Sequence, residues 1–130
     1  MENLISSTFA GNALLLIFGL LFIFHLLVLS GTIPSTIVWA GKIKNRKELV
    51  RMEMVSLLIL VVATVIVSLR LGHLTFIQNT SVLNAGMWLL FALFTLNTIG
   101  NLTAKNPFEK YGFGLLTLVM ALLALSLVGL

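Results

Sequence analysis

The residues best suited to chemistry in this sequence are polar side chains that stand inside long apolar runs. His25 lies midway along the run from residue 9 to residue 33, in which Asn12 is the only other strongly polar side chain. Histidine titrates near physiological pH, so this position suits a proton relay or a cation site. The same ring also suits a structural hydrogen bond to a neighbouring helix. In either role we expect His25 to point away from lipid.

A second group of polar residues closes a later apolar run. Asn97, Asn101 and Lys105 are spaced four residues apart, which places them on one face of a helix. An asparagine in hydrocarbon needs a hydrogen-bond partner, so we expect Asn97 to face the interior of a helix bundle. Asn97 and Asn101 either clasp two helices together or line a polar pathway. For His25 alone we favour the structural hydrogen bond. Of the two residues, we expect Asn97 to be a clasp and His25 to be the more functional.

Arg70 and His73 form a third group, after another apolar run. They line an outer vestibule that contacts an anion or a lipid headgroup, or Arg70 simply extends to the headgroups for solvation. Glu2 is the acid expected on the same side of the membrane. A metal site is not expected, because the two histidines lie far apart and the chain has neither cysteine nor aspartate.

The sequence contains none of the short motifs of common hydrolases and nucleotide-binding proteins. We expect all four acids to lie at helix ends, so His25 would lack an acid that orients it as a catalytic base. An enzyme is therefore disfavoured, and a lipid- or quinone-modifying enzyme is the least favoured function. No catalytic residue and no cofactor are predicted.

The composition indicates that these residues lie in a membrane. The 130-residue chain is 59% hydrophobic and 9% charged, with a mean hydropathy of +1.13, whereas soluble domains carry about 25% charged residues. A helix of about 20 apolar residues crosses the hydrocarbon core of a bilayer. The sequence therefore predicts an all-α fold, a single transmembrane domain with four helices in an antiparallel bundle. Its expected spans are 9–33, 54–77, 82–104 and 111–130.

Local signals predict where some of these helices begin, end and pack. Asn106, Pro107 and Glu109 resemble a helix start, with an asparagine cap, proline in the first position and an acid in the first turn, near water.

Pro34 is interpreted as a kink in the first helix, with Trp39 at the headgroups; a break and a short re-entrant segment are the alternative. The second helix is expected to begin within the basic loop, residues 42–53. Small residues in the last span predict close helix packing: Gly114, Thr117, Ala121 and Ala124.

The basic residues predict the orientation of the chain in the membrane. Five of the eight Lys and Arg residues lie between Lys42 and Arg51, and Lys105 and Lys110 lie in the third connection. Basic connections face the cytoplasm, so both termini are expected outside. Membrane topology and attraction to anionic headgroups explain this charge, and no nucleic-acid partner is predicted.

Residues 97–110 and the apolar span after them resemble the C-terminal part of a family of small, uncharacterised four-helix bacterial integral membrane proteins. The resemblance covers only the last part of the chain. It implies a multi-pass location in the bacterial cytoplasmic (inner) membrane and carries no activity with it.

Three functions are compatible with the sequence. The first is a permeation or transport protein that works as a homo-oligomer, with a pathway lined by His25, Asn97 and Asn101. Four helices barely enclose a pore, so this function requires at least a dimer. The second is an accessory or regulatory subunit that binds another membrane protein through its small-residue faces. The third is the disfavoured membrane enzyme, and we favour the first.

Overall fold

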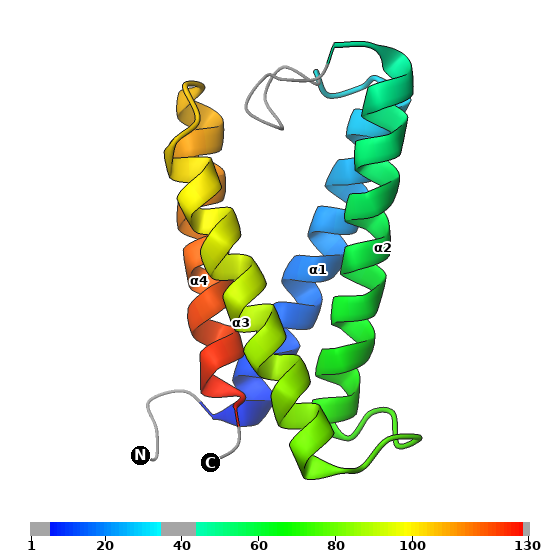
Figure 1. Cartoon of the computed structure of the whole chain (residues 1–130), viewed down its shortest axis with the longest axis vertical. Helices are drawn as coiled ribbons and strands as arrows, with labels where there is room; N and C mark the ends of the chain where they lie inside the picture. The colour runs from blue at the N-terminus through cyan, green and yellow to red at the C-terminus, as the bar shows by residue number, and fades with distance from the viewer. Residues whose placement is uncertain (1–5, 35–43, 129–130) are drawn as a thin grey trace.

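The computed structural model describes residues 6–34 and 44–128 of the chain (Figure 1). The described residues form four long helices and no strand, which confirms the all-α prediction with four helices. These are α1 (Ser7–Ser30), α2 (Arg46–Leu71), α3 (Thr80–Leu102) and α4 (Gly114–Ser126), and a π-helical turn, η3 (Phe108–Phe113), leads into α4. By length and composition, α1, α2, α3 and the stretch Phe108–Ser126 are each apolar enough to cross a membrane.

Side-chain caps and left-handed glycines define the ends of the first three helices. Ser6, Asn45 and Asn79 cap α1, α2 and α3, and each side-chain oxygen accepts a backbone N–H from the first helical turn. Gly31 and Gly72 are the C-cap residues that follow the last residues of α1 and α2. Their φ angles of 90° and 87° lie in the left-handed region, which costs glycine little. The predicted continuation of the second helix to residue 77 is therefore wrong, because the chain leaves the helix at Gly72.

Pro34 does not kink the first helix. α1 ends at Ser30, and Gly31 caps it through N–H donation to the carbonyls of Leu27 and Val28. Pro34 lies beyond this cap, so the predicted kink is wrong. Trp39 and the alternative re-entrant segment fall outside the described residues.

Asn106 and Pro107 come directly before η3, the turn that leads into the last helix. Asn106 Oδ1 accepts hydrogen bonds from the backbone N–H groups of Phe108 (2.8 Å) and Glu109 (3.4 Å), so Asn106 occupies the capping position. The π-helical turn that follows was not predicted. Glu109 is only 5% exposed, so the expectation that its side chain lies near water is wrong.

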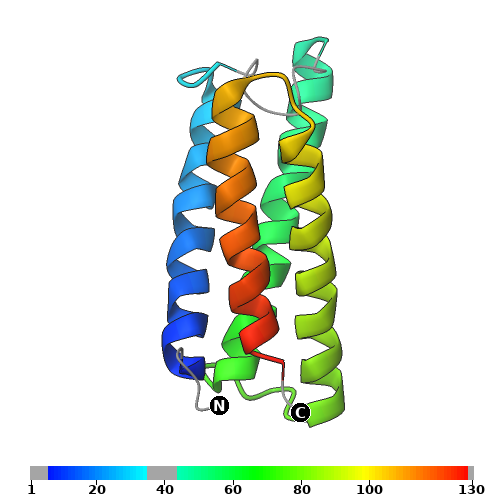
Figure 2. The same cartoon turned by 90° about the vertical axis from the view of Figure 1, so that its left-hand side faces the viewer.

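The four helices associate as two pairs. α1 packs against α2, α3 packs against α4, and the pairs meet mainly through α1–α4 and α2–α3 contacts. The first residues of α1, the last of α4 and the connection 72–79 lie at one end, which we call the terminal end (Figures 1 and 2). The start of α2 and residues 103–107 lie at the opposite end, which we call the basic end. The two pairs are closest at the terminal end and diverge toward the basic end (Figure 1).

The main apolar core joins the two pairs. Phe18, Met87 and Met120, from α1, α3 and α4, are each no more than 1% exposed. The rings of Phe18 and Phe94 lie 5.8 Å apart and connect α1 to α3. Because these large side chains occupy the space between the helices, the centre of the bundle is filled at this level.

A second, smaller cluster lies toward the basic end and joins α1, α2 and η3. Its members, which we call the Phe24 cluster, are Phe24, Val28, Ile33, Leu49 and Phe113. The rings of Phe24 and Phe113 are 5.1 Å apart and meet edge to face, a favourable aromatic geometry. This contact links the first helix to the start of the last one.

Small residues bring α3 and α4 close together. The four small residues predicted to mediate packing in the last helix are all buried: Gly114, Thr117, Ala121 and Ala124. A Cβ atom at Gly114 would lie 2.9 Å from Leu102 Cδ2. The absence of a side chain at this position therefore permits the close approach of the two helices.

Two glycines of α1 provide a matched test of the α1–α2 packing. A Cβ atom at Gly11 would lie 2.4 Å from Leu71 Cδ2, whereas one at Gly19 would have nothing within 4 Å. Alanine favours a helix by up to about 1 kcal/mol over glycine. We expect Gly19→Ala to raise the thermal unfolding midpoint in detergent. Gly11→Ala should lower it, because displacing Leu71 costs about 1–3 kcal/mol. Circular dichroism measures the thermal unfolding midpoint of each variant. Equal midpoints for the two variants would contradict this packing.

Candidate functional site

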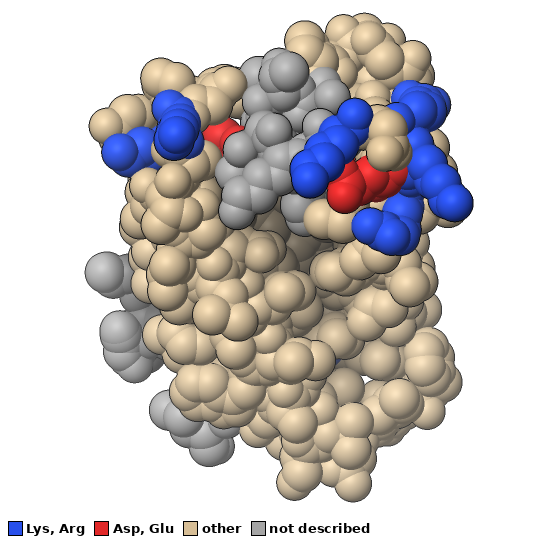
Figure 3. Space-filling view, turned by 45° about the horizontal axis from the view of Figure 1, so that its top comes forward, with Lys and Arg blue, Asp and Glu red and all other residues tan. Residues whose placement is uncertain are grey.

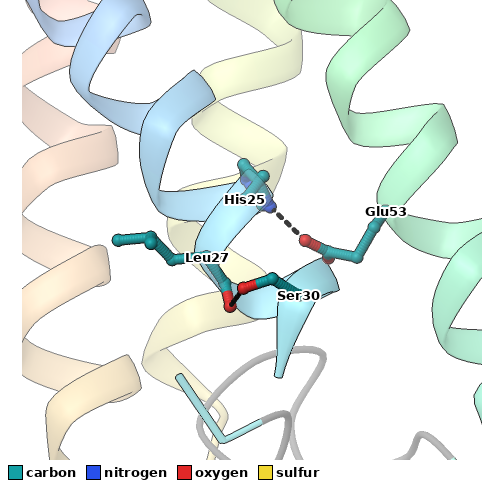
Figure 4. Close-up of polar contacts among 4 residues, drawn as sticks. All are labelled: His25, Leu27, Ser30 and Glu53. Carbon is teal, nitrogen blue, oxygen red and sulfur yellow. Dashed lines mark hydrogen bonds and ion pairs between the residues drawn. The ribbon is translucent and has the colours of Figure 1, made fainter. Parts of the chain in front are cut away.

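A buried carboxyl group from α2 meets the imidazole ring of α1. His25 Nδ1 and Glu53 Oε1 lie 2.7 Å apart across the helix interface (Figure 4). The Glu53 side chain is 0% exposed and that of His25 is 18% exposed. At this distance the two groups share a proton: the ring N–H donates to the carboxylate, or a protonated carboxyl donates to the ring nitrogen.

The helical register of α2 places Glu53 at this interface. α2 begins at Arg46, so Glu53 stands about two turns inside the helix. Glu53 belongs to a stripe of buried residues spaced three or four apart, which is the spacing of one helix face: Leu49, Glu53, Leu57, Leu60, Ala63 and Val67. The expectation that all acids lie at helix ends is therefore wrong for Glu53. Its spacing from Leu49 and Leu57 was the sequence signal that pointed to a buried position.

Apolar groups flank His25 on its own helix. The Phe24 ring meets the His25 ring edge to face, with centroids 5.5 Å apart. Ser30, just over one turn closer to the helix end, donates its hydroxyl to the carbonyl of Leu27 (2.9 Å), so it is not directed at the pair (Figure 4). The partner that lowers the cost of burying the imidazole is therefore Glu53.

The His25–Glu53 pair can bind and release protons. With one proton between the imidazole and the carboxyl group, the pair has no net charge. A second proton gives it a net positive charge, and removal of the first gives it a net negative charge. Either net charge is costly in apolar surroundings. The arrangement suits a proton-binding site, and it also holds α1 against α2.

Asn101 belongs to a different polar contact, between α3 and α4. The hydroxyl oxygens of Thr98 and Thr117 lie 3.0 Å apart, and Asn101 Nδ2–H donates to Thr117 Oγ1 (3.4 Å). These hydrogen bonds join α3 to α4, so the side chains form an interhelical clasp. His25 and Asn101 thus lie in separate helix pairs, and each pair has its own polar contact.

Asn97 is exposed, so the expectation that it faces the bundle interior is wrong. The buried residues of α3 are Met87, Leu90, Phe94 and Thr98. Adjacent residues of a helix point about 100° apart, and Thr98 continues the buried spacing where Asn97 does not. Lys105 follows the end of α3 at Leu102, so the predicted three-residue face does not form.

Arg70 connects α2 to the end of α4. Arg70 Nε–H donates to the carbonyl oxygen of Leu127 (2.7 Å), which is the C-cap residue of α4. The last carbonyls of a helix lack helical partners and carry partial negative charge, so an arginine there is favourable. His73 is exposed beyond Gly72, and Glu2 lies outside the described residues. The vestibule role of Arg70 and His73 stays a prediction.

Metal binding finds no support within the described residues, 6–34 and 44–128. No group of three or more His, Cys, Asp and Glu side chains that can hold a metal ion occurs among them. The chemistry of the candidate site is therefore argued from the imidazole and the carboxyl group alone.

Comparisons with known proteins do not identify the chain: no protein-family model, no curated protein and no solved structure matches it. The resemblance of residues 97–110 and the last span stays a resemblance.

We expect His25 and Glu53 to be energetically coupled. His25→Leu removes the 2.7 Å partner of the buried carboxyl group, and Glu53→Leu removes the partner of the imidazole. Loss of one member of a buried ion pair costs about 3–5 kcal/mol. The double variant replaces both groups with apolar side chains and should recover much of this loss. Unfolding free energies of the wild type, both single variants and the double variant give the coupling energy.

Asn97→Leu is the control for this cycle, because it also replaces a polar residue in an apolar helix. Its side chain is exposed, so its unfolding free energy should stay within about 0.5 kcal/mol of the wild type. Additive effects of the His25 and Glu53 substitutions would show that the two groups do not interact.

Proposed function

We propose that this protein carries protons across a membrane as a homo-oligomer, and that the His25–Glu53 pair is its proton-binding site. The observation that supports this function is a carboxyl group with 0% exposure placed 2.7 Å from an imidazole. Ionisable side chains inside membrane-spanning helices are costly, and those that are retained often belong to proton relays. Imidazole and carboxyl groups are the usual members of such relays.

The proposal places the chain in the bacterial cytoplasmic membrane as an antiparallel bundle of four transmembrane helices. The basic end faces the cytoplasm, and both termini face outside. The distribution of positive charge supports this orientation, because the described bases other than Arg70 gather at the basic end (Figure 3): Lys44, Arg46, Lys47, Arg51, Lys105 and Lys110. In this orientation the His25–Glu53 pair lies nearer the cytoplasm.

The packed core supports the proposed homo-oligomer. Phe18, Met87 and Met120 fill the space between the helix pairs, so a path through the centre of a single chain is obstructed there. A proton that reaches the His25–Glu53 pair from the basic end therefore needs another route to the far side. We propose that this route runs between two or more copies of the chain.

The same filled core also favours a second function, that of an accessory subunit. A chain whose interior is packed with apolar side chains presents its outer helix faces to other proteins or to lipid. In this alternative the His25–Glu53 pair holds α1 against α2, and the protein binds a larger membrane protein. Purified in lipid, the proton carrier should form a defined homo-oligomer, whereas the accessory subunit should be monomeric without its partner.

The proposed topology can be tested with single cysteines, because the chain has none of its own. Lys47 near the start of α2 and Thr75 in the connection 72–79 are both exposed, and neither caps a helix. Lys47→Cys should react with a membrane-impermeant maleimide only from the cytoplasmic side, and Thr75→Cys only from outside. The reverse pattern would contradict the proposed orientation.

The proposed activity can be measured in vesicles that contain a pH-sensitive dye. Under an imposed membrane potential, the wild type should acidify the lumen faster than protein-free vesicles do. Glu53→Gln keeps the size of the side chain but removes its titratable proton, so the rate should fall to that of protein-free vesicles. Glu48→Gln removes a carboxyl group from the surface of the same helix, outside the His25–Glu53 pair, and should retain the wild-type rate. Wild-type vesicles that behave like protein-free ones would reject the proposal.

A further inference from the structure

A second buried carboxyl group lies at the basic end of the bundle. Glu109 belongs to η3, close to the start of the last helix, yet it is only 5% exposed. Most glutamates near a helix start stay in water, because burial of a carboxylate is costly. Glu109 and Glu53 are the two buried acids of the described chain, and the proposed function so far uses only Glu53.

The Phe24 cluster connects the segments that carry these two acids, α2 and η3. Phe113 of η3 and Leu49 of α2 both belong to this cluster. Glu109 precedes Phe113 by four residues on the side of the basic end, and Glu53 follows Leu49 by four residues toward the terminal end. Each acid thus stands about one helical turn along its own helix from a member of the cluster. The Phe113 ring contacts Phe24, the residue before His25, so Phe113 lies level with the His25–Glu53 pair and Glu109 lies about one turn nearer the basic end.

The Phe24 cluster has the character of an apolar barrier. Val28 is 1% exposed and Leu49 is 7% exposed. The Phe113 ring meets Phe24 on one side and Phe108 on the other, with centroids 5.1 and 5.2 Å apart. Apolar constrictions of this kind can gate ion passage by excluding water. Phe113 ends a π-helical turn, and such turns are frequent at functional sites.

We infer that Glu109 is a second proton-binding site, on the basic side of the His25–Glu53 pair, and that the Phe24 cluster gates proton transfer between them. This inference rests on the proposed function. In the transfer, the O–H bond of protonated Glu109 breaks, the proton crosses the transiently hydrated cluster, and it binds to the deprotonated His25–Glu53 pair. Glu109 then takes up a new proton from the basic end.

The other charged groups near this route lie at its outer edge. Lys110 is half-buried, with its Nζ 5.5 Å from the centre of the Tyr111 ring, and Lys105 is exposed. On α2, Glu48 and Arg51 are 3.9 Å apart on the surface side of the helix.

The competing explanation is that Glu109 only stabilises the helix start, where an acid interacts favourably with the helix dipole. Glu109→Gln separates the two roles in the vesicle assay, because it keeps the size of the side chain and removes the titratable group. We expect proton flux to fall to the level of protein-free vesicles with little change in the thermal unfolding midpoint. Glu109→Asp retains a carboxyl group and should restore part of the flux. Wild-type flux per folded protein in Glu109→Gln would overturn the inference.

Phe113→Ala tests the gate independently, including the case in which Glu109→Gln does not fold. Removing the ring opens the barrier to water, so proton flux per folded protein should rise above the wild-type rate. Unchanged or reduced flux would overturn the assignment of the gate.

Failure of the proposed function gives a different result, since wild-type vesicles would then show no flux at all. If only this inference fails, Glu53→Gln abolishes flux and Glu109→Gln does not.

Discussion

The structure depends on one constraint: a carboxyl group removed from water must have a partner. Glu53 meets this requirement through His25, which fixes α1 and α2 in a single rotational setting relative to each other. Apolar packing alone specifies such settings less strictly, because many side chains of similar size can exchange places across an interface. A rotation of either helix would separate the ring from the carboxyl group and leave both in apolar surroundings. The pair therefore acts as a register element as well as a chemical group.

The remaining contacts divide the molecule into two structural halves. Toward the terminal end, Phe18, Met87 and Met120 pack between all the helices, and Arg70 attaches α2 to the end of α4. Toward the basic end, the helix pairs diverge, and polar contacts lie within each pair (Figure 1). The fold thus joins a half packed with apolar side chains to a half that contains the two buried acids, Glu53 and Glu109.

The π-helical turn η3 connects these polar contacts across the bundle. Asn106 begins the last helix, and η3 then carries both Glu109 and Phe113 toward the interior. Through the contact between Phe113 and Phe24, the start of the last helix packs beside the ring of His25. The His25–Glu53 pair thus lies next to an element that differs from a regular α-helix. This adjacency is the basis for treating the two buried acids as parts of one site.

The sequence by itself determined the helical content, because long apolar runs and caps such as Asn106 act within a few residues of the chain. The end of α2 at Gly72 was not among these predictions. It also marked His25 as an ionisable group inside an apolar run, and the small residues of α4 as packing positions. Only the tertiary structure decided which polar residues meet. Glu53 turned out to be the partner of His25, and Thr98 took the buried position expected for Asn97. Both outcomes depend on the rotation of each helix about its axis, and neighbouring helices set that rotation through contacts distant in sequence.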